Sequence, residues 1–163
     1  IPLVLGKKDV ITSAQTGTGK TAAFALPILQ LLFDYQDAPK KGKKIKALVV
    51  SPTRELAIQI DANFKIYGKY TNLRSAVIYG GTSIEPQKDI LNKGIDILIA
   101  TPGRLLDLHK QDLINLSSRV TPTFSASSIT NGKSSAEASE VYMGPLKPTA
   151  NKYGIRPTWS IWQ

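Results

Sequence analysis

Cysteine is absent from the 163-residue sequence, and histidine occurs once, at His109. Without cysteine there is no disulfide framework, no thiolate metal site and no cysteine nucleophile. A single histidine argues against a zinc site, because zinc draws most of its protein ligands from Cys and His. Long apolar runs are also missing, so no segment has the length of a membrane span. The start, Ile1-Pro2-Leu3, has no initiator Met and no signal-peptide pattern. We therefore expect a cytoplasmic chain that begins inside a longer protein and does not contact a membrane.

Acidic residues are outnumbered, with 12 Asp and Glu against 21 Lys and Arg, which gives a formal charge of +9 and a pI near 9.8. Such a balance favours polyanionic partners, nucleic acid first, although an ordinary basic surface explains the charge equally well. Hydrophobic residues make up 42% of the chain, which is enough for a packed core. The length fits one domain, or one domain with a tail.

Residues 1–118 alternate short β-branched runs with helical patterns. The runs are almost continuously apolar, which is typical of strands buried on both faces in a parallel sheet covered by helices. We expect parallel strands at 9–13, 47–51, 75–79 and 96–100, and helices at 20–33, 54–69, 86–92 and 103–109. This order predicts an α/β doubly wound sheet. Pro27 is expected to kink the first helix or to end its first part.

Residues 119–163 are different in character. They are rich in Ser and Thr, and no segment sustains a helical or strand period; only 141–143 is a short strand-like run. We therefore expect an irregular C-terminal tail, disordered or loosely packed and unrelated to residues 1–118.

A glycine- and threonine-rich loop follows the first predicted strand and opens the first predicted helix. This is the pattern of a phosphate-binding loop, with Ala14 where the general form has its first glycine. Gly17 and Gly19 allow the backbone N–H groups to point at phosphate oxygens, and the helix N-terminus adds positive potential. The Lys20 ammonium can bridge the terminal phosphates, and the Thr21 hydroxyl can ligate Mg²⁺. The loop comprises Ala14, Gln15, Thr16, Gly17, Thr18, Gly19, Lys20 and Thr21.

Three further motifs follow the other predicted strands. They are Pro52-Thr53-Arg54-Glu55-Leu56-Ala57, Gly80-Gly81 and Thr101-Pro102-Gly103-Arg104. Thr53 is a suitable helix N-cap, and Arg54 and Arg104 can reach phosphates. Taken singly, each motif is explained as well or better by an ordinary loop or a capped helix start. Because carboxyl ends of parallel strands meet at one edge, however, we expect all four motifs to share that edge.

Together these segments resemble motifs I, Ia, GG and Ib of the DEAD-box RNA helicases, and the stretches at 26–29, 69–70 and 105–108 resemble the bacterial RhlE-like subgroup. The resemblance covers residues 1–118. It implies a partial RecA-like domain that binds ATP with Mg²⁺ and grips RNA by its sugar–phosphate backbone. Residues Ala14 to Thr21 would hold the nucleotide phosphates. The RNA path would be lined by Pro52, Thr53, Arg54, Gly81, Thr101, Gly103 and Arg104.

The sequence also departs from the family. After Ser118 the family continues into a strand that ends in Asp-Glu-Ala-Asp, whereas this chain runs into Arg119-Val120-Thr121-Pro122. The only later acidic residues are Glu137 and Glu140. The family's adenine-reading glutamine segment and second motor domain are not present either. We therefore assign no catalytic residue, and expect a helicase fragment that is inactive alone and selects poorly among nucleotide bases.

Two other functions are alternatives to a helicase fragment. A different phosphate-loop enzyme, such as a small-molecule kinase, would not need the motifs at 52–57 and 101–104 together. A non-catalytic RNA-binding or interaction module remains compatible with the sequence, because phosphate and RNA contacts do not require the missing carboxylates. The basic stretch 39–46 and the tail residues Trp159 and Trp162 are best explained as a solvated loop and incidental tail residues. The sequence does not determine the oligomeric state.

Overall fold

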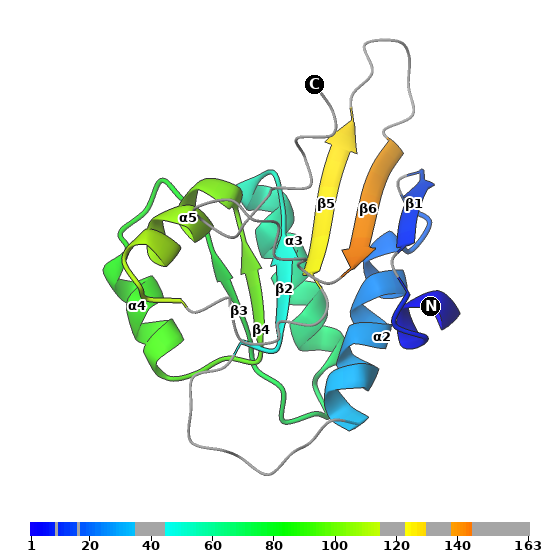
Figure 1. Ribbon diagram of the computed structural model, residues 1–163, viewed down its shortest axis with the longest axis horizontal. Coiled ribbons are helices and arrows are strands. Elements are labelled where there is room, and N and C mark those ends of the chain that lie inside the picture. Colours follow the sequence, from blue (N-terminus) through cyan, green and yellow to red (C-terminus); the bar gives the residue numbers. More distant parts are fainter. Residues whose placement is uncertain (9, 16, 35–44, 115–122, 130–137, 145–163) are drawn as a thin grey trace.

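The computed structural model describes residues 1–8, 10–15, 17–34, 45–114, 123–129 and 138–144 (Figure 1). Its helices are α1 (Pro2–Leu5), α2 (Lys20–Asp34), α3 (Arg54–Tyr67), α4 (Glu85–Asn92) and α5 (Pro102–Lys110). Its strands are β1 (Val10–Ala14), β2 (Ala47–Val50), β3 (Ser75–Ile78), β4 (Ile97–Ala100), β5 (Thr123–Ile129) and β6 (Ala138–Gly144). Apart from α1, every element within residues 1–114 was predicted, with bounds that differ by at most two residues.

The strands form one sheet in the order β1-β6-β5-β2-β4-β3. Strand β4 pairs in parallel with β2 and β3, and β2 pairs in parallel with β5. Strand β6 is antiparallel to both β5 and β1, so β1 runs in the same direction as β5 and β2. The four strands predicted from the sequence therefore share one direction, as expected. Strand β1, however, pairs with β6 and not with another predicted strand.

Strands β5 and β6 come from the segment in which we expected no regular structure, so that expectation was wrong for residues 123–129 and 138–144. Only the centre of β6, residues 141–143, had been predicted as strand-like. These strands mix Ser, Ala and apolar residues without a clear period, which specifies a strand and its register weakly. The pairing depends on the strand edges that the rest of the sheet leaves open: β5 pairs with the edge of β2, and β6 pairs with β1. The rest of the predicted tail lies outside the described residues.

Helices cover both faces of the sheet, which explains the almost continuous apolar runs. Alternate residues of β2 and β4 point to opposite faces. Ala47, Val49, Ile97 and Ile99 pack with the buried side chains of α1, α2 and α3. Leu48, Leu98 and Ala100 pack on the other face, with buried residues of β3, α4 and α5. No helix within the described residues is long and apolar enough to cross a membrane.

Helix α2 continues through Pro27 to Asp34, so of the two expected effects of Pro27 the ending of the first part of this helix was wrong, and a kink stays a prediction. Proline removes one N–H from the helical ladder and leaves the carbonyl four residues earlier without that donor. The surrounding side chains Phe24, Ile28 and Leu29 are buried, as is Pro27 itself. Burial of this face stabilises the helical conformation against the local cost of proline.

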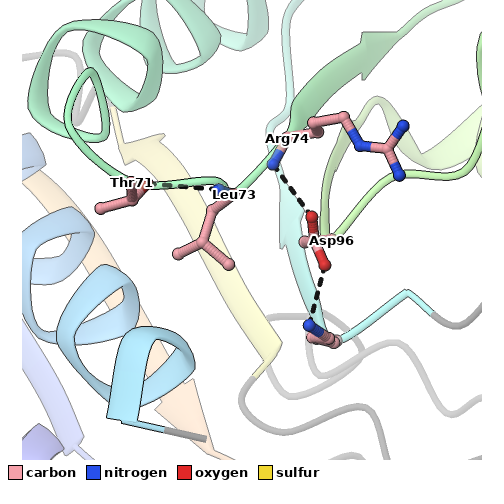
Figure 2. Close-up of polar contacts among 5 residues, drawn as sticks. Thr71, Leu73, Arg74 and Asp96 are labelled. Atoms are coloured by element: carbon pink, nitrogen blue, oxygen red, sulfur yellow. Dashed lines mark hydrogen bonds and ion pairs between the residues drawn. The ribbon is translucent and has the colours of Figure 1, made fainter. Parts of the chain in front are cut away.

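At the edge of the sheet where the parallel strands begin, one carboxylate connects three strands. Residues Lys46, Arg74 and Asp96 each stand immediately before a strand. One oxygen of Asp96 pairs with the Lys46 ammonium at 2.9 Å, and the other accepts the Arg74 backbone N–H at 3.0 Å. Figure 2 shows the Asp96 carboxylate beside the Arg74 backbone N–H, and the Thr71 hydroxyl accepting the N–H of Leu73 nearby. These polar side chains are used to hold three strands together, at the edge opposite the predicted motifs.

Replacing Asp61 by Ala is expected to lower the stability of the fold. Asp61 is 4% exposed, accepts the Ser75 hydroxyl at 2.7 Å and pairs with the Lys65 ammonium at 2.7 Å. The substitution leaves a part-buried hydroxyl without its acceptor, so we expect a loss of about 1–3 kcal/mol. Thermal unfolding followed by circular dichroism measures this loss of stability as a lower Tm. Asp89→Ala, on an exposed residue of α4, is the matched control, and an equal Tm for both variants would contradict the expectation.

Candidate functional site

The loop after β1 has the backbone geometry that its glycines predict. Gly17 has a φ of 80° and Gly19 a φ of 81°, both in the left-handed region that favours glycine. A Cβ atom at either position would meet nothing within 4 Å, so backbone strain, and not lack of space, disfavours other residues there. The loop leads directly into α2 at Lys20. Thr16 lies outside the described residues.

The Lys20 side chain folds back over this loop. Its ammonium donates to the carbonyl of Ala14 at 2.6 Å and also to the carbonyl of Gln15. The Thr18 hydroxyl donates to the same Gln15 carbonyl at 2.8 Å. Lys20 and Thr21 occupy the first turn of α2, where backbone N–H groups have no intrahelical acceptor and the helix end is positive. A positive charge, exposed loop backbone and a helix N-terminus thus meet at one place.

The motif after β2 is organised by short-range hydrogen bonds. The Thr53 side chain accepts the Leu56 N–H at 3.3 Å, so the N-cap predicted at Thr53 is confirmed. The buried Ser51 hydroxyl donates to the Thr53 carbonyl at 3.2 Å. Pro52 and Arg54 are exposed. The Arg54 guanidinium lies 4.9 Å from the centre of the Tyr79 ring, which links this motif to the end of β3.

The motifs after β3 and β4 are linked as well. Arg104 donates through Nη2 to the carbonyl of Thr82 at 2.8 Å, whereas its buried Nη1 has no hydrogen-bond partner among the described residues. Gly81 has a φ of 81° and open space around it. Thr101 is the N-cap of α5 but makes no side-chain capping bond, and Gly103 is exposed. The structure therefore brings the three motifs after β2, β3 and β4 together on one edge of the sheet.

The loop after β1 stands apart from those three motifs within the sheet. Strands β6 and β5 lie between β1 and β2. Because β1 runs in the same direction as β2, its carboxyl end faces the same edge (Figure 1). All four motifs therefore lie on the same edge of the sheet, as expected. The loop after β1, however, is separated from the other three motifs by β6 and β5.

One of the two later acidic residues is placed beside β1. Glu140 of β6 is in register with Ser13, which is the penultimate residue of β1. Glu137 lies outside the described residues. In the part of the chain that the structure describes, no group of three or more His, Cys, Asp or Glu side chains is gathered as a metal site.

Sequence reasoning missed Gln87, which the structure buries under the glycine loop. Its side chain is hydrogen-bonded to Tyr79, Thr82 and Ser83. One feature of the sequence could have indicated that Gln87 is buried. It lies on α4 one helical turn before the buried Leu91, at a position where an apolar residue is expected. A polar residue on the buried face of a helix must find hydrogen-bond partners.

Comparison with known proteins identifies the family. The family model described as DEAD/DEAH box helicase matches residues 1–121. The chain belongs to the DEAD/DEAH box helicase family. It is 43% identical over 118 residues to the ATP-dependent RNA helicase RhlB of Shewanella piezotolerans, and 51% identical over 116 residues to the DEAD-box ATP-dependent RNA helicase RhpA of Helicobacter pylori.

These matches cover 72% and 71% of this chain but only 27% and 22% of the relatives, so the chain spans about a quarter of their length. Among solved structures, a hypothetical ATP-dependent RNA helicase from Sulfolobus tokodaii has a TM-score of 0.62 at 43% identity, covering 72% of this chain and 32% of that one. The yeast DEAD-box splicing factor Prp28 has a TM-score of 0.57 at 37% identity, covering 66% and 26%. The predicted α/β, partial RecA-like fold is confirmed.

Proposed function

We propose that this chain carries the nucleotide-phosphate and RNA-backbone contacts of a DEAD-box ATP-dependent RNA helicase, within the front part of its first motor domain. The observation that carries the proposal is the loop after β1, where two glycines with positive φ, the Lys20 ammonium and the start of α2 converge. The relatives' names, which describe ATP-dependent RNA helicases, support the same assignment.

On the nucleotide side, the loop fits the triphosphate of ATP. Gly17 and Gly19 have positive φ, the backbone conformation found in anion-binding loops, and the space beside both residues is open. The Lys20 ammonium would move from loop carbonyls to phosphate oxygens, and the Thr21 hydroxyl would be a ligand of Mg²⁺. Bound Mg²⁺ neutralises charge on the phosphates. The proposed set is Ala14, Gln15, Thr16, Gly17, Thr18, Gly19, Lys20 and Thr21.

On the RNA side, the edge formed by the other three motifs fits a sugar–phosphate backbone. Arg54 is an exposed cation on this edge, and exposed backbone at Gly81 and Gly103 permits close approach. Contacts of this kind bind RNA without reading its sequence. The proposed set is Pro52, Thr53, Arg54, Gly81, Thr101, Gly103 and Arg104. The same proposal includes a cytoplasmic location and leaves the oligomeric state open.

RNA binding by this chain is expected to be weak, independent of sequence and strongly weakened by salt, because each neutralised phosphate releases counterions. Titration of fluorescent single strands of different sequence, over a series of salt concentrations, measures it. Arg54→Ala should lower affinity for all sequences and reduce the slope of log K against log salt by about 0.7, the value for one phosphate of a single strand.

The matched control is Arg74→Ala, which removes an exposed arginine from the opposite edge of the sheet. It should leave both affinity and slope almost unchanged. Salt-insensitive binding, sharp sequence preference, or equal effects of the two substitutions would contradict the proposed RNA edge.

A non-catalytic RNA-binding or interaction module is the second candidate. The departure of the chain from the family's carboxylate motif after Ser118 favours it. Paired ATPase and RNA-binding assays on the same preparation separate the two, because the module would bind RNA with no RNA-dependent turnover. The RhlE-like subgroup stays a prediction supported by the segments at 26–29, 69–70 and 105–108.

A further inference from the structure

Gln87 makes an unusually complete set of hydrogen bonds with one loop. It lies on α4 and is 7% exposed. Its amide nitrogen faces the carbonyls of Tyr79 and Ser83, each at 3.2 Å, and the Thr82 hydroxyl at 3.0 Å. Its amide oxygen accepts the Tyr79 N–H at 3.2 Å. The two N–H groups thus face three acceptors, and this arrangement determines the orientation of the amide.

Among the described residues, two other side chains contact the loop that Gln87 binds: Arg54, which lies over the Tyr79 ring, and Arg104. Residues 80–83 are exposed and follow the end of β3, and they include two consecutive glycines. Glycine has more conformational freedom to lose than any other residue, so an ordered diglycine turn needs bonds from outside. Gln87 supplies them from α4, and Arg104 adds one from α5 to the Thr82 carbonyl at 2.8 Å.

We propose that Gln87 is a positioning residue for RNA binding, which holds the 79–83 turn so that Gly81 presents its backbone on the RNA edge. This inference rests on the proposed function of that edge. Gln87 is buried and acts through the loop. A side chain that merely packs α4 would affect overall stability, and so all ligands alike. A positioning residue affects RNA binding while nucleotide binding at the distant loop after β1 stays unchanged.

Three substitutions in the full chain test the proposal. Gln87→Met keeps the volume and removes all hydrogen bonds. Gln87→Glu keeps an acceptor for the Tyr79 N–H but, when ionised, cannot donate to the carbonyls of Tyr79 and Ser83. Thr82→Val changes an exposed residue and removes one acceptor, so it tests the contact even where a buried substitution prevents folding. Gln59→Met, on an exposed position of α3, is the matched control.

Two measurements are made on each variant. Hydrogen exchange of the amides at 79–83 should become faster in the Gln87 variants, while exchange at 97–100 in β4 stays as in the unaltered chain. The dissociation constant for single-stranded RNA at low ionic strength should rise about tenfold for Gln87→Met and Gln87→Glu, and about twofold for Thr82→Val. The dissociation constant for a fluorescent ATP analogue should not change.

Unchanged RNA affinity in a folded Gln87 variant, or in Thr82→Val where neither Gln87 variant folds, would overturn the inference while leaving the proposed function intact. A parallel loss of RNA and nucleotide affinity would also overturn it, because that is the effect of a merely structural residue. If the unaltered chain bound no RNA, the proposed RNA function itself would fail, and the role of Gln87 with it. These outcomes are therefore distinguishable in one set of titrations.

Discussion

Phosphate release from ATP by this chain is expected to stay at background, with or without RNA, and the chain is expected to unwind no duplex. Transfer of a phosphoryl group to water requires a positioned metal ion and an oriented water molecule. Lys20 and Thr21 supply contacts to the phosphate side of such a site. The family resemblance leads us to expect an acidic strand end after position 118, where this chain has Arg119-Val120-Thr121-Pro122.

The expected effect is large because the rate falls by a further factor for each catalytic group that a site lacks. Removing one group that stabilises the transition state typically costs about a hundredfold or more in kcat. Glu140 is the one described acidic residue in register with the end of β1, so it is the residue to examine as a substitute carboxylate.

The measurement is phosphate release at saturating RNA, comparing the unaltered chain with Lys20→Ala and Glu140→Gln. We expect all three to coincide with the buffer control. Turnover that both substitutions reduce would show that β6 supplies a carboxylate to the nucleotide site. Turnover that survives Lys20→Ala would indicate a contaminating ATPase.

Loss of nucleotide binding in Lys20→Ala is the second large expected effect. The Lys20 ammonium is in contact with the loop carbonyls of Ala14 and Gln15, within reach of an anion held by the loop. A hydrogen bond between charged groups contributes about 1.5–3 kcal/mol, which corresponds to roughly a tenfold to hundredfold change in affinity. Since the chain is expected to bind nucleotide weakly, such a change should abolish measurable binding.

Titration of a fluorescent ATP analogue, with and without Mg²⁺, measures the effect. Lys93→Ala is the matched control, because it removes an exposed lysine at the end of α4. The control should bind as the unaltered chain does. Equal affinity of Lys20→Ala and Lys93→Ala would show that the loop after β1 is not the phosphate site.

Within residues 1–114, the sequence by itself determined most of the secondary structure. Continuous apolar runs such as Ile97–Ala100 are typical of strands buried on both faces, so they predict a parallel strand covered by helices. Gly17, Gly19 and Thr53 have roles that follow from local backbone requirements, namely positive φ and helix capping. These features were predictable because their causes lie within a few residues of each other.

Only the tertiary structure decided how the elements meet. The strand order that separates β1 from β2, and the entry of β5 and β6 into the sheet, depend on which strand edges are left open, and no local pattern records that. Helix α2 passes through Pro27 because its buried face outweighs the local preference. Arg104 reaches the Thr82 carbonyl from 22 residues away in the sequence, and Gln87 meets the same loop only because packing turns α4 back toward it. Sequence periodicity reports burial and local conformation, whereas such contacts depend on long-range geometry.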